Sequence, residues 1–214
     1  MDAKYNIPTD AADLSKFKDD MMADAKTALA QEWNADGKND DGSEKRTGTV
    51  DKDGLTYYGC KGTLPYTPKQ MAEFYADPKF MLGFVEDSTK FEPVKVIDTE
   101  AGIEQCHLKT PFIMSNREMI SFVLRRWEGE TLYNIVRPAS VPEFPTNDDF
   151  ERAFVFNNMK IEPHADGCQI TTGNVCDLGG AVPDWLKNQI NKLYLTEVND
   201  LRVYIPKYLK EKKQ

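Results

Sequence analysis

Histidine and cysteine, which often carry catalysis near neutral pH, are scarce here: the chain of 214 residues has two histidines and four cysteines. His107 directly follows Cys106. Neighbouring residues of a strand point to opposite faces, so these two side chains cannot act as nucleophile and base. Glu104 and His107 are the only acid–base pair that the sequence suggests, and the same alternation separates them. We therefore expect no catalytic site.

Metal and phosphate chemistry are not predicted either. Cys168 and Cys176 are eight positions apart and lack the Cys-x-x-Cys or histidine cluster of a zinc site. Gly179 and Gly180 lack the glycine-rich fingerprint, and the Lys-Ser/Thr that follows it, of a phosphate loop. The first ten residues have no apolar core of a signal peptide, so we expect buried free thiols in a cytoplasmic protein without cofactors.

The charge balance narrows the partners. Asp and Glu number 35 against 27 Lys and Arg, which gives a formal charge of −8. Nucleic-acid binding needs a clustered basic face, so no nucleic acid is expected, and membrane contact should be transient. With 40% hydrophobic and 11% aromatic residues, the chain should fold as one domain over residues 1–214, as a monomer. No stretch approaches the roughly 18 apolar residues of a membrane span.

Periodicity predicts an α+β order of elements. A helix should start after Thr9 or Asp10 and run toward Trp33, and the charged, turn-rich residues 34–46 should form a mobile loop. The further predicted elements are strands at 47–51 and 55–64 joined at Lys52–Gly54, helices from Pro68 and Pro78, strands at 92–98, 102–110, 117–127, 131–138, 151–161 and 168–177, and a long helix from Val182. Pro206 should kink or break that last helix.

Short connections between successive strands indicate an antiparallel meander. About nine strands have too much apolar face for one flat layer. We therefore predict a helix-grip fold, in which a curved antiparallel sheet wraps around the long C-terminal helix and leaves an internal hydrophobic cavity.

Three segments in order carry a family resemblance. Lys109–Glu118 is similar to the pattern Pro-Phe-x-x-Ser-x-Arg-Asp, with Glu118 in place of Asp. Ser140–Pro145 and the later Arg152 match a serine-to-proline segment and its arginine. Asp177–Leu186 matches Asp-x-Gly-Gly-x-Ile-Pro-x-Trp-Leu. Residues from about 33 to 208 thus resemble a START domain (steroidogenic acute regulatory protein-related lipid transfer), closest in the first motif to the phosphatidylcholine transfer protein branch.

The resemblance implies a non-enzymatic protein that holds one lipid, a sterol, fatty acid or phospholipid, in an internal cavity and carries it between membranes. The C-terminal helix would close this cavity. On this basis the residues expected to contact lipid are Met81, Val85, Glu104, Cys106, Arg117, Met119, Val123, Ile190, Tyr194 and Val198. Arg117 has a second interpretation, as a structural link between loop and sheet. Ile190, Tyr194 and Val198 have one as core packing.

Glu104 would be either a polar anchor for the lipid or an exposed edge-strand residue, because a carboxylate on an apolar face is costly unless it is paired or hydrated. The sterol carriers of the family have an acid near this position, but their partner arginine falls on Val123 here. Cys106 and Met119 replace the aromatic cage of the phosphatidylcholine branch, and Met81 and Val85 replace its arginine and acid. We therefore expect a less polar lipid, such as a sterol or fatty acid.

Two further hypotheses stay open. A cyclase or hydrolase on a related helix-grip fold would need titratable groups that converge in the cavity. A regulatory, lipid-sensing module would use its surface to bind another protein.

Overall fold

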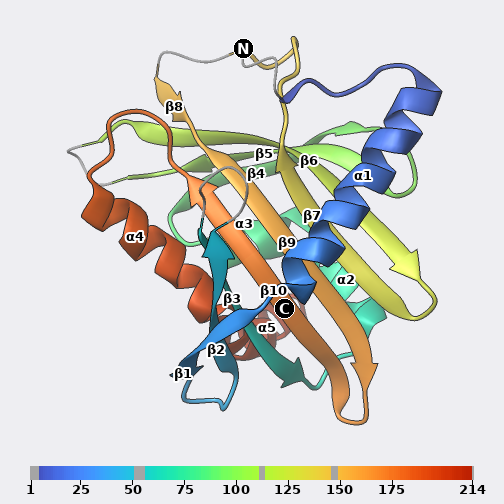
Figure 1. Ribbon diagram of the computed structural model, residues 1–214, viewed down its shortest axis with the longest axis vertical. Helices are drawn as coiled ribbons and strands as arrows, with labels where there is room; N and C mark the ends of the chain where they lie inside the picture. Colours follow the sequence, from blue (N-terminus) through green and yellow to red (C-terminus); the bar gives the residue numbers. More distant parts are fainter. Residues whose placement is uncertain (1–4, 51–55, 111–113, 146–148, 214) are drawn as a thin grey trace.

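The computed structural model describes residues 5–50, 56–110, 114–145 and 149–213 (Figure 1). Its elements are α1 (Ala11–Ala30), β1 (Trp33–Lys38), β2 (Glu44–Val50), β3 (Thr56–Leu64), α2 (Pro68–Ala76), α3 (Pro78–Phe84), β4 (Ser88–Val96), β5 (Ala101–Leu108), β6 (Asn116–Glu128), β7 (Thr131–Pro138), β8 (Phe150–Arg152), β9 (Phe154–His164), β10 (Gly167–Asp177), α4 (Asp184–Lys192), the 3-10 helix η2 (Leu193–Leu195) and α5 (Glu197–Glu211).

The ten strands of the described residues form one sheet, in which nine follow the order β1-β2-β3-β10-β9-β7-β6-β5-β4. These strands pair antiparallel, and the short β8 pairs parallel with β6. The last strand, β10, lies between β3 and β9, so it joins the N-terminal strands to the later meander. The fold is α+β, a curved sheet with a C-terminal helix, which confirms the predicted fold class.

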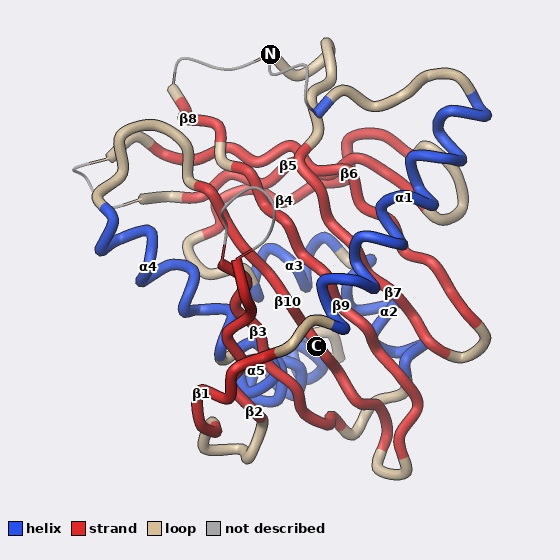
Figure 2. Tube along the Cα trace, viewed as in Figure 1, coloured by secondary structure: helices blue, strands red, loops and turns tan. Residues whose placement is uncertain are grey.

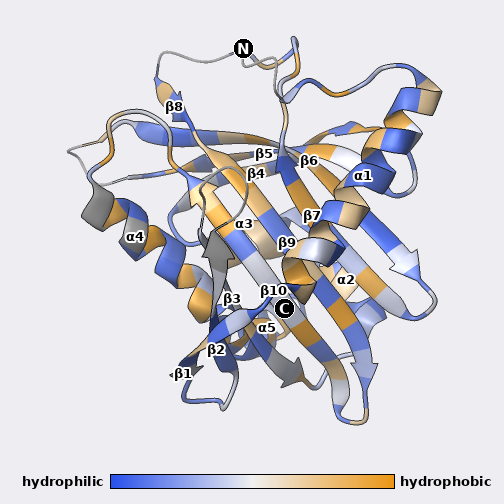
Figure 3. Cartoon of the chain, viewed as in Figure 1, coloured by the Kyte–Doolittle hydropathy of each residue, from blue (hydrophilic) through white to orange (hydrophobic). Residues whose placement is uncertain are grey.

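Helices cover both faces of the sheet (Figure 2). We call the face under α1 the outer face and the face under α2, α3, α4 and α5 the inner face. On the outer face, Met21, Met22 and Ala25 of α1 pack against residues such as Phe122 and Ile135. Hydrophobic and hydrophilic residues alternate along β9 and β10 in Figure 3, as expected for strands whose two faces have different neighbours.

Local sequence explains where the helices start. The side chain of Asp10 accepts hydrogen bonds from the backbone N–H groups of Ala12 and Asp13, as the prediction of a cap at this point requires. Thr67 and Gln70 form a capping box at the start of α2. Among the described helices, none is long and apolar enough to cross a membrane. The four cysteines are buried free thiols, as predicted.

The prediction of a mobile loop at 34–46 is wrong. Residues 33–38 and 44–50 form the hairpin β1–β2, which turns between Asn39 and Gly42. β1 is almost wholly exposed, so its sequence has no apolar alternation that would indicate a strand. The predicted turn at Lys52–Gly54 lies outside the described residues, as do Pro111–Ile113 of the first motif.

The C-terminal helix also differs from the prediction. It is interrupted at η2 and Thr196, and α5 then continues through Pro206 to Glu211. Pro206 lies on the exposed side of α5, so the carbonyl that it leaves without a helical partner can be hydrated. Leu201, Ile205 and Tyr208 are buried on the opposite side and keep the helix packed on the sheet.

Candidate ligand site on the inner face

The predicted contacts of β5 and β6 share the inner face. Cys106 lies directly opposite Met119, and Glu104 lies opposite Ser121. Val123 lies opposite Gly102 on the same face and is 2% exposed. Burial raises the pKa of Cys106 to about 12, so this thiol is not a nucleophile near neutral pH.

Glu104 has an arginine partner that the sequence analysis missed. Arg125 Nη2 lies 2.7 Å from Glu104 Oε1 and also donates to the backbone carbonyl of Tyr75 at 2.8 Å. Arg125 is two residues beyond Val123, where the arginine was sought, and strand alternation puts both on the inner face. Glu104 is therefore neither an exposed edge residue nor an unpaired charge.

The ion pair belongs to a line of polar side chains that crosses the inner face from β5 to α5. We call this line the polar band; its members are Glu104, Arg125, Asn134, Asn157, Asn174 and Glu197. Arg125 lies opposite Asn134, and Asn157 lies opposite Asn174. Asn174 Nδ2 donates to Glu197 Oε2 at 2.8 Å, which closes the line at the first turn of α5.

Several polar atoms along the polar band lack a protein partner. Arg125 Nε, Asn134 Oδ1 and Asn157 Oδ1 are buried without a hydrogen bond to the described residues, and so is the hydroxyl of Tyr75, which projects from α2. A buried polar atom without a partner costs about 1–3 kcal/mol. Four such atoms on one face therefore point to hydrogen-bonding groups that a ligand or water supplies.

Glu197 is the most perturbed group of the polar band. It is buried, and that burial raises the pKa of its carboxyl to about 7. Hydrogen bonds from Asn174 and Thr172 oppose the shift, and Asp200 adds to it. Burial also raises the pKa values of the Tyr75 and Tyr194 hydroxyls, both of which lie in the field of Glu197.

On one side of the polar band the inner face is densely filled. This packed cluster consists of Cys60, Leu64, Met71, Phe74, Tyr75, Phe80, Leu132, Met159, Ile161, Cys168, Ile170, Val198, Leu201, Ile205 and Tyr208. Two of the predicted lipid contacts fall here. Val198 is fully buried and its N–H points to Cys60 Sγ at 3.4 Å, while Met81 packs against the edge of the cluster.

On the other side of the polar band lie two smaller apolar clusters, one that includes residues of α4 and one formed mainly by residues of the sheet. The helix wall consists of Cys176, Leu178, Val182 and Leu186, with Met114, Val155, Ile190 and Tyr194 partly buried against it. The sheet wall consists of Cys106, Met119 and Ala153, with Val85, Phe91, Leu108 and Val155 partly buried against it. Five predicted contacts thus lie on these walls: Val85, Cys106, Met119, Ile190 and Tyr194.

The three motif segments meet at one corner of the molecule. Arg117 Nε donates to the carbonyl of Leu178 at 2.7 Å, and Arg152 Nη2 lies 3.0 Å from Glu118 Oε2. Gly179 has a φ of +62°, and a side chain there would collide with the carbonyl of Arg152. Arg117 is only 3% exposed and donates to the backbone carbonyls of Leu178 and Ser115, so these contacts are structural.

His107 belongs to the outer face. Its Nε2 lies 3.2 Å from Glu118 Oε1, and Gln105 donates to the same oxygen at 2.6 Å. Glu104 and His107 therefore point away from each other, as strand alternation requires.

Sequence reasoning missed Arg125, the asparagines and Glu197. Alternation from Val123 could have found Arg125, and polar residues inside otherwise apolar strands could have flagged Asn134, Asn157 and Asn174. Glu197 gave no signal, because a glutamate at a helix start is ordinarily exposed.

Comparisons with known proteins agree with the geometry. Neither a protein-family model nor a curated protein matches the sequence. Among solved structures, human StAR-related lipid transfer protein 5 superposes with a TM-score of 0.79 at 15% identity, covering 91% of this chain and 97% of its own. Human STARD10 superposes with a TM-score of 0.77 at 17% identity, and the match covers 99% of this chain and 85% of STARD10. A STAR-related lipid transfer protein fragment from Xanthomonas axonopodis superposes with a TM-score of 0.68 at 18% identity, and the match covers 80% of this chain and 97% of the fragment. The chain therefore has the fold of StAR-related lipid transfer domains.

Proposed function

We propose that this chain is a non-enzymatic lipid carrier, which holds one lipid between the helix wall and the sheet wall and moves it between membranes. The observation that carries the proposal is the polar band, which is bordered on one side by two apolar walls. Among the described residues these walls share Val155 and are otherwise separate. Moving an acyl chain into water costs about 0.8 kcal/mol per methylene, so a protein that shields it speeds transfer.

The polar end of the lipid would rest on the polar band. The partnerless Arg125 Nε is a donor, and the oxygens of Asn134 and Asn157 are acceptors, which suits a small head such as a hydroxyl or carboxyl group. Cys106 and Met119 leave no aromatic cage for choline. A sterol, a fatty acid or another lipid with a small head is therefore favoured over phosphatidylcholine, despite the likeness of the first motif to that branch.

The proposal also covers the domain organisation, the location and the absence of catalysis. Residues 1–214 would act as one lipid-binding domain, a cytoplasmic monomer that touches membranes transiently. The alternative of an enzyme loses the pair that the sequence offered for it, because Glu104 and His107 lie on opposite faces. We leave Met81 and Val198 out of the proposed contacts, because both pack with the packed cluster.

Native mass spectrometry of protein purified from a eukaryotic lysate, followed by lipid extraction, tests the proposal. One lipid per chain is expected, together with transfer between liposomes above the buffer rate. Met119→Trp should fill the space between the walls and block both, whereas Val96→Trp adds the same side chain at an 81% exposed position and should block neither. Absence of bound lipid together with transfer at the buffer rate would refute the carrier.

A further inference from the structure

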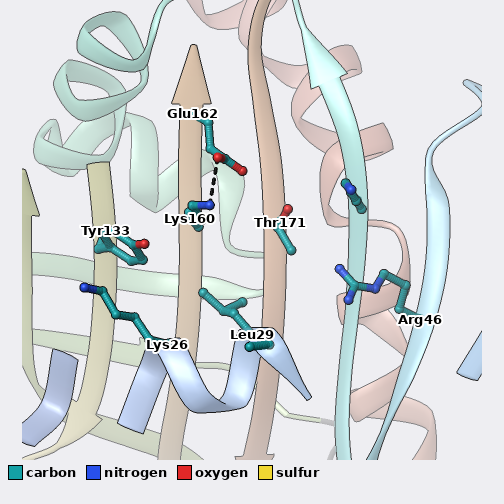
Figure 4. Close-up of a pocket in the computed structure, with 9 residues that line it drawn as sticks. Lys26, Leu29, Arg46, Tyr133, Lys160, Glu162 and Thr171 are labelled. Carbon is teal, nitrogen blue, oxygen red and sulfur yellow. Dashed lines mark ion pairs between the residues drawn. The ribbon is translucent and has the colours of Figure 1, made fainter. Parts of the chain in front are cut away.

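A second candidate site lies on the outer face, on the side of the sheet away from the polar band. It is an open cleft of about 380 Å³ between the last turns of α1 and strands β2, β3, β7, β9 and β10 (Figure 4). We call it the cationic cleft; it is lined by Lys26, Leu29, Ala30, Arg46, Lys61, Tyr133, Lys160, Glu162 and Thr171. Four cations and one carboxylate line it, in a chain whose formal charge is −8.

Strand register arranges part of this lining in one transverse row. Thr171 lies opposite Lys61 of β3 on one side and opposite Lys160 of β9 on the other, and Lys160 in turn lies opposite Tyr133. Strands are spaced by about 4.8 Å, so the two lysine backbones are about 10 Å apart with a hydroxyl donor between them. An anion above Thr171 can thus be reached from both sides.

Arg46 adds a guanidinium that is held in place before any ligand arrives. It stacks on the ring of Trp33 with 4.5 Å between its Cζ and the ring centroid. It is partly buried, and loss of hydration lowers its pKa. Among the described residues no carboxylate lies within ion-pair distance of Arg46. The charge of the exposed Glu44 opposes this pKa shift from a distance, but it forms no ion pair with Arg46. A partly dehydrated cation without a paired carboxylate is an anchor for an anion.

The acids around the cleft are weak competitors. Glu162 pairs with Lys160 at 2.7 Å and Glu128 pairs with Lys26 at 2.6 Å, but each of these side chains is about a third exposed or more. Such pairs contribute at most about 1 kcal/mol and are readily exchanged. Glu44 lies opposite Lys61 and is itself exposed.

The C-terminal end of α1 repels a bound anion less than an ordinary helix end would. The last carbonyls of a helix are partially negative and would repel an anion. Two of them already accept hydrogen bonds from side chains, the carbonyl of Ala28 from Gln31 and the carbonyl of Leu29 from Trp33.

We propose that the cationic cleft binds a phosphate-bearing small molecule or lipid headgroup that carries at least two anionic groups, one near Arg46 and Lys61 and one near Lys160 and Lys26. Leu29 and Tyr133 supply apolar surface for the carbon atoms that connect these groups. Phosphate oxygens suit this lining because guanidinium and ammonium groups form charge-assisted hydrogen bonds with them. This site is independent of the proposed lipid carrier function, since it uses the opposite face of the sheet.

Calorimetric titration of the full chain with inositol trisphosphate at low ionic strength tests the site. Arg46→Gln and Lys61→Gln should each weaken binding about tenfold, the loss of one charge-assisted hydrogen bond. Glu162→Gln should strengthen it about threefold by removing a competitor. Lys69→Gln, an equal charge change on the exposed side of α2, should leave binding unchanged. Thermal melts confirm that each variant is folded.

Vesicles separate the two sources of the phosphate. Phosphatidylcholine vesicles with phosphatidylinositol bisphosphate are compared in flotation with phosphatidylserine vesicles of equal charge. If the protein binds the bisphosphate vesicles and inositol trisphosphate displaces it from them, the ligand is a lipid headgroup. If the protein binds inositol trisphosphate but not the vesicles, the ligand is a free metabolite. Either outcome supports the site. No binding of either probe, or equal losses in Lys61→Gln and Lys69→Gln, overturns it. The cleft variants should retain co-purified lipid, and Met119→Trp should retain phosphate binding, so the two proposals fail separately.

Discussion

The two halves of the inner face lie on the same strands but are completed in different ways. On one side of the polar band, α2, α3 and α5 fill the packed cluster, in which Met71, Phe80 and Leu201 are fully buried. On the other side, α4 carries one apolar wall and β5 and β6 carry another, with many members only partly buried. In the first half, protein side chains pack against one another and fill the interior. In the second half, we propose that a lipid packs between the two walls.

This difference teaches that an apolar face does not by itself define a ligand site. Tyr194 and Val198 are four residues apart near the break between α4 and α5, yet one packs on the helix wall and the other in the packed cluster. We propose that the side of the polar band on which a residue lies decides whether it contacts the lipid or packs within the protein.

Methionine truncation measures the contrast with one chemical change. Met71→Ala removes a fully buried side chain from the packed cluster and should lower the free energy of unfolding by about 2–5 kcal/mol. Met119→Ala, on the sheet wall, should cost about 1 kcal/mol in lipid-free protein, because fewer protein atoms lose contact. Urea unfolding gives both values. Equal losses would mean that both halves are packed alike, and the comparison would fail.

Glu197 lies on the polar band between the two halves of the inner face. It should make the free energy of unfolding fall as the pH rises, the opposite of the usual effect of a carboxylate. Its pKa in the folded state, about 7, is above its ordinary value of 4.5, so the folded state binds the proton more tightly. The stabilising effect is complete below pH 4.5 and is lost as the pH rises through about 7, which amounts to about 3 kcal/mol.

Glu197→Gln removes this titration. The variant should be more stable than the parent at pH 8 by up to about 3 kcal/mol and equal to it near pH 4. Urea unfolding across this range checks the difference. Parallel pH profiles for the two proteins would show that Glu197 is ionised at little cost and that the polar band is well hydrated.

Sequence reasoning reached the strands and their faces but not the polar band. Alternation correctly separated Glu104 and Cys106 from His107, because a buried antiparallel strand has a strict period of two. It did not reveal that Arg125 turns back to Glu104, or that Asn157 and Asn174 come together from separate strands. Such pairs depend on register between strands, which a single sequence does not encode locally.

The helical ends were harder still to predict. The sequence predicts that Pro206 kinks or breaks the last helix, but α5 continues through it. The proline is exposed, and the buried Leu201 and Ile205 hold the helix on the sheet. The real interruption, at Thr196, has no glycine or proline to mark it. Tertiary packing overrides local propensity at both points.

A substitution at Asn191 tests whether α4 opens to admit lipid to the proposed site between the helix wall and the sheet wall. Asn191 Oδ1 accepts from the N–H of Cys176 at 2.8 Å and its Nδ2 donates to the Cys176 carbonyl at 3.1 Å, so it fastens α4 to β10. Asn191→Leu should cost about 2 kcal/mol, because both backbone groups lose their partner, and should accelerate lipid exchange between liposomes. Asn199→Leu, on α5, is the matched control. Lower stability with unchanged exchange would place the opening elsewhere.

A substitution at Asp77 provides the corresponding test for the packed cluster, and its expected effect on stability is the smallest. Asp77 caps α3 and accepts hydrogen bonds from Tyr208 and Lys212 of the C-terminal region, and the bond from Tyr208 is the main reason that its pKa falls to about 2. This contribution is present above pH 3.8 and is lost as the pH falls through about 2. After allowance for solvent screening, Asp77→Asn should cost about 1 kcal/mol at neutral pH, measured by urea unfolding. Lipid exchange should not change, since α5 stays anchored by Leu201 and Ile205. Faster exchange in Asp77→Asn would show that α5 opens together with α4, and the division of the inner face into a fixed half and an opening half would then be wrong.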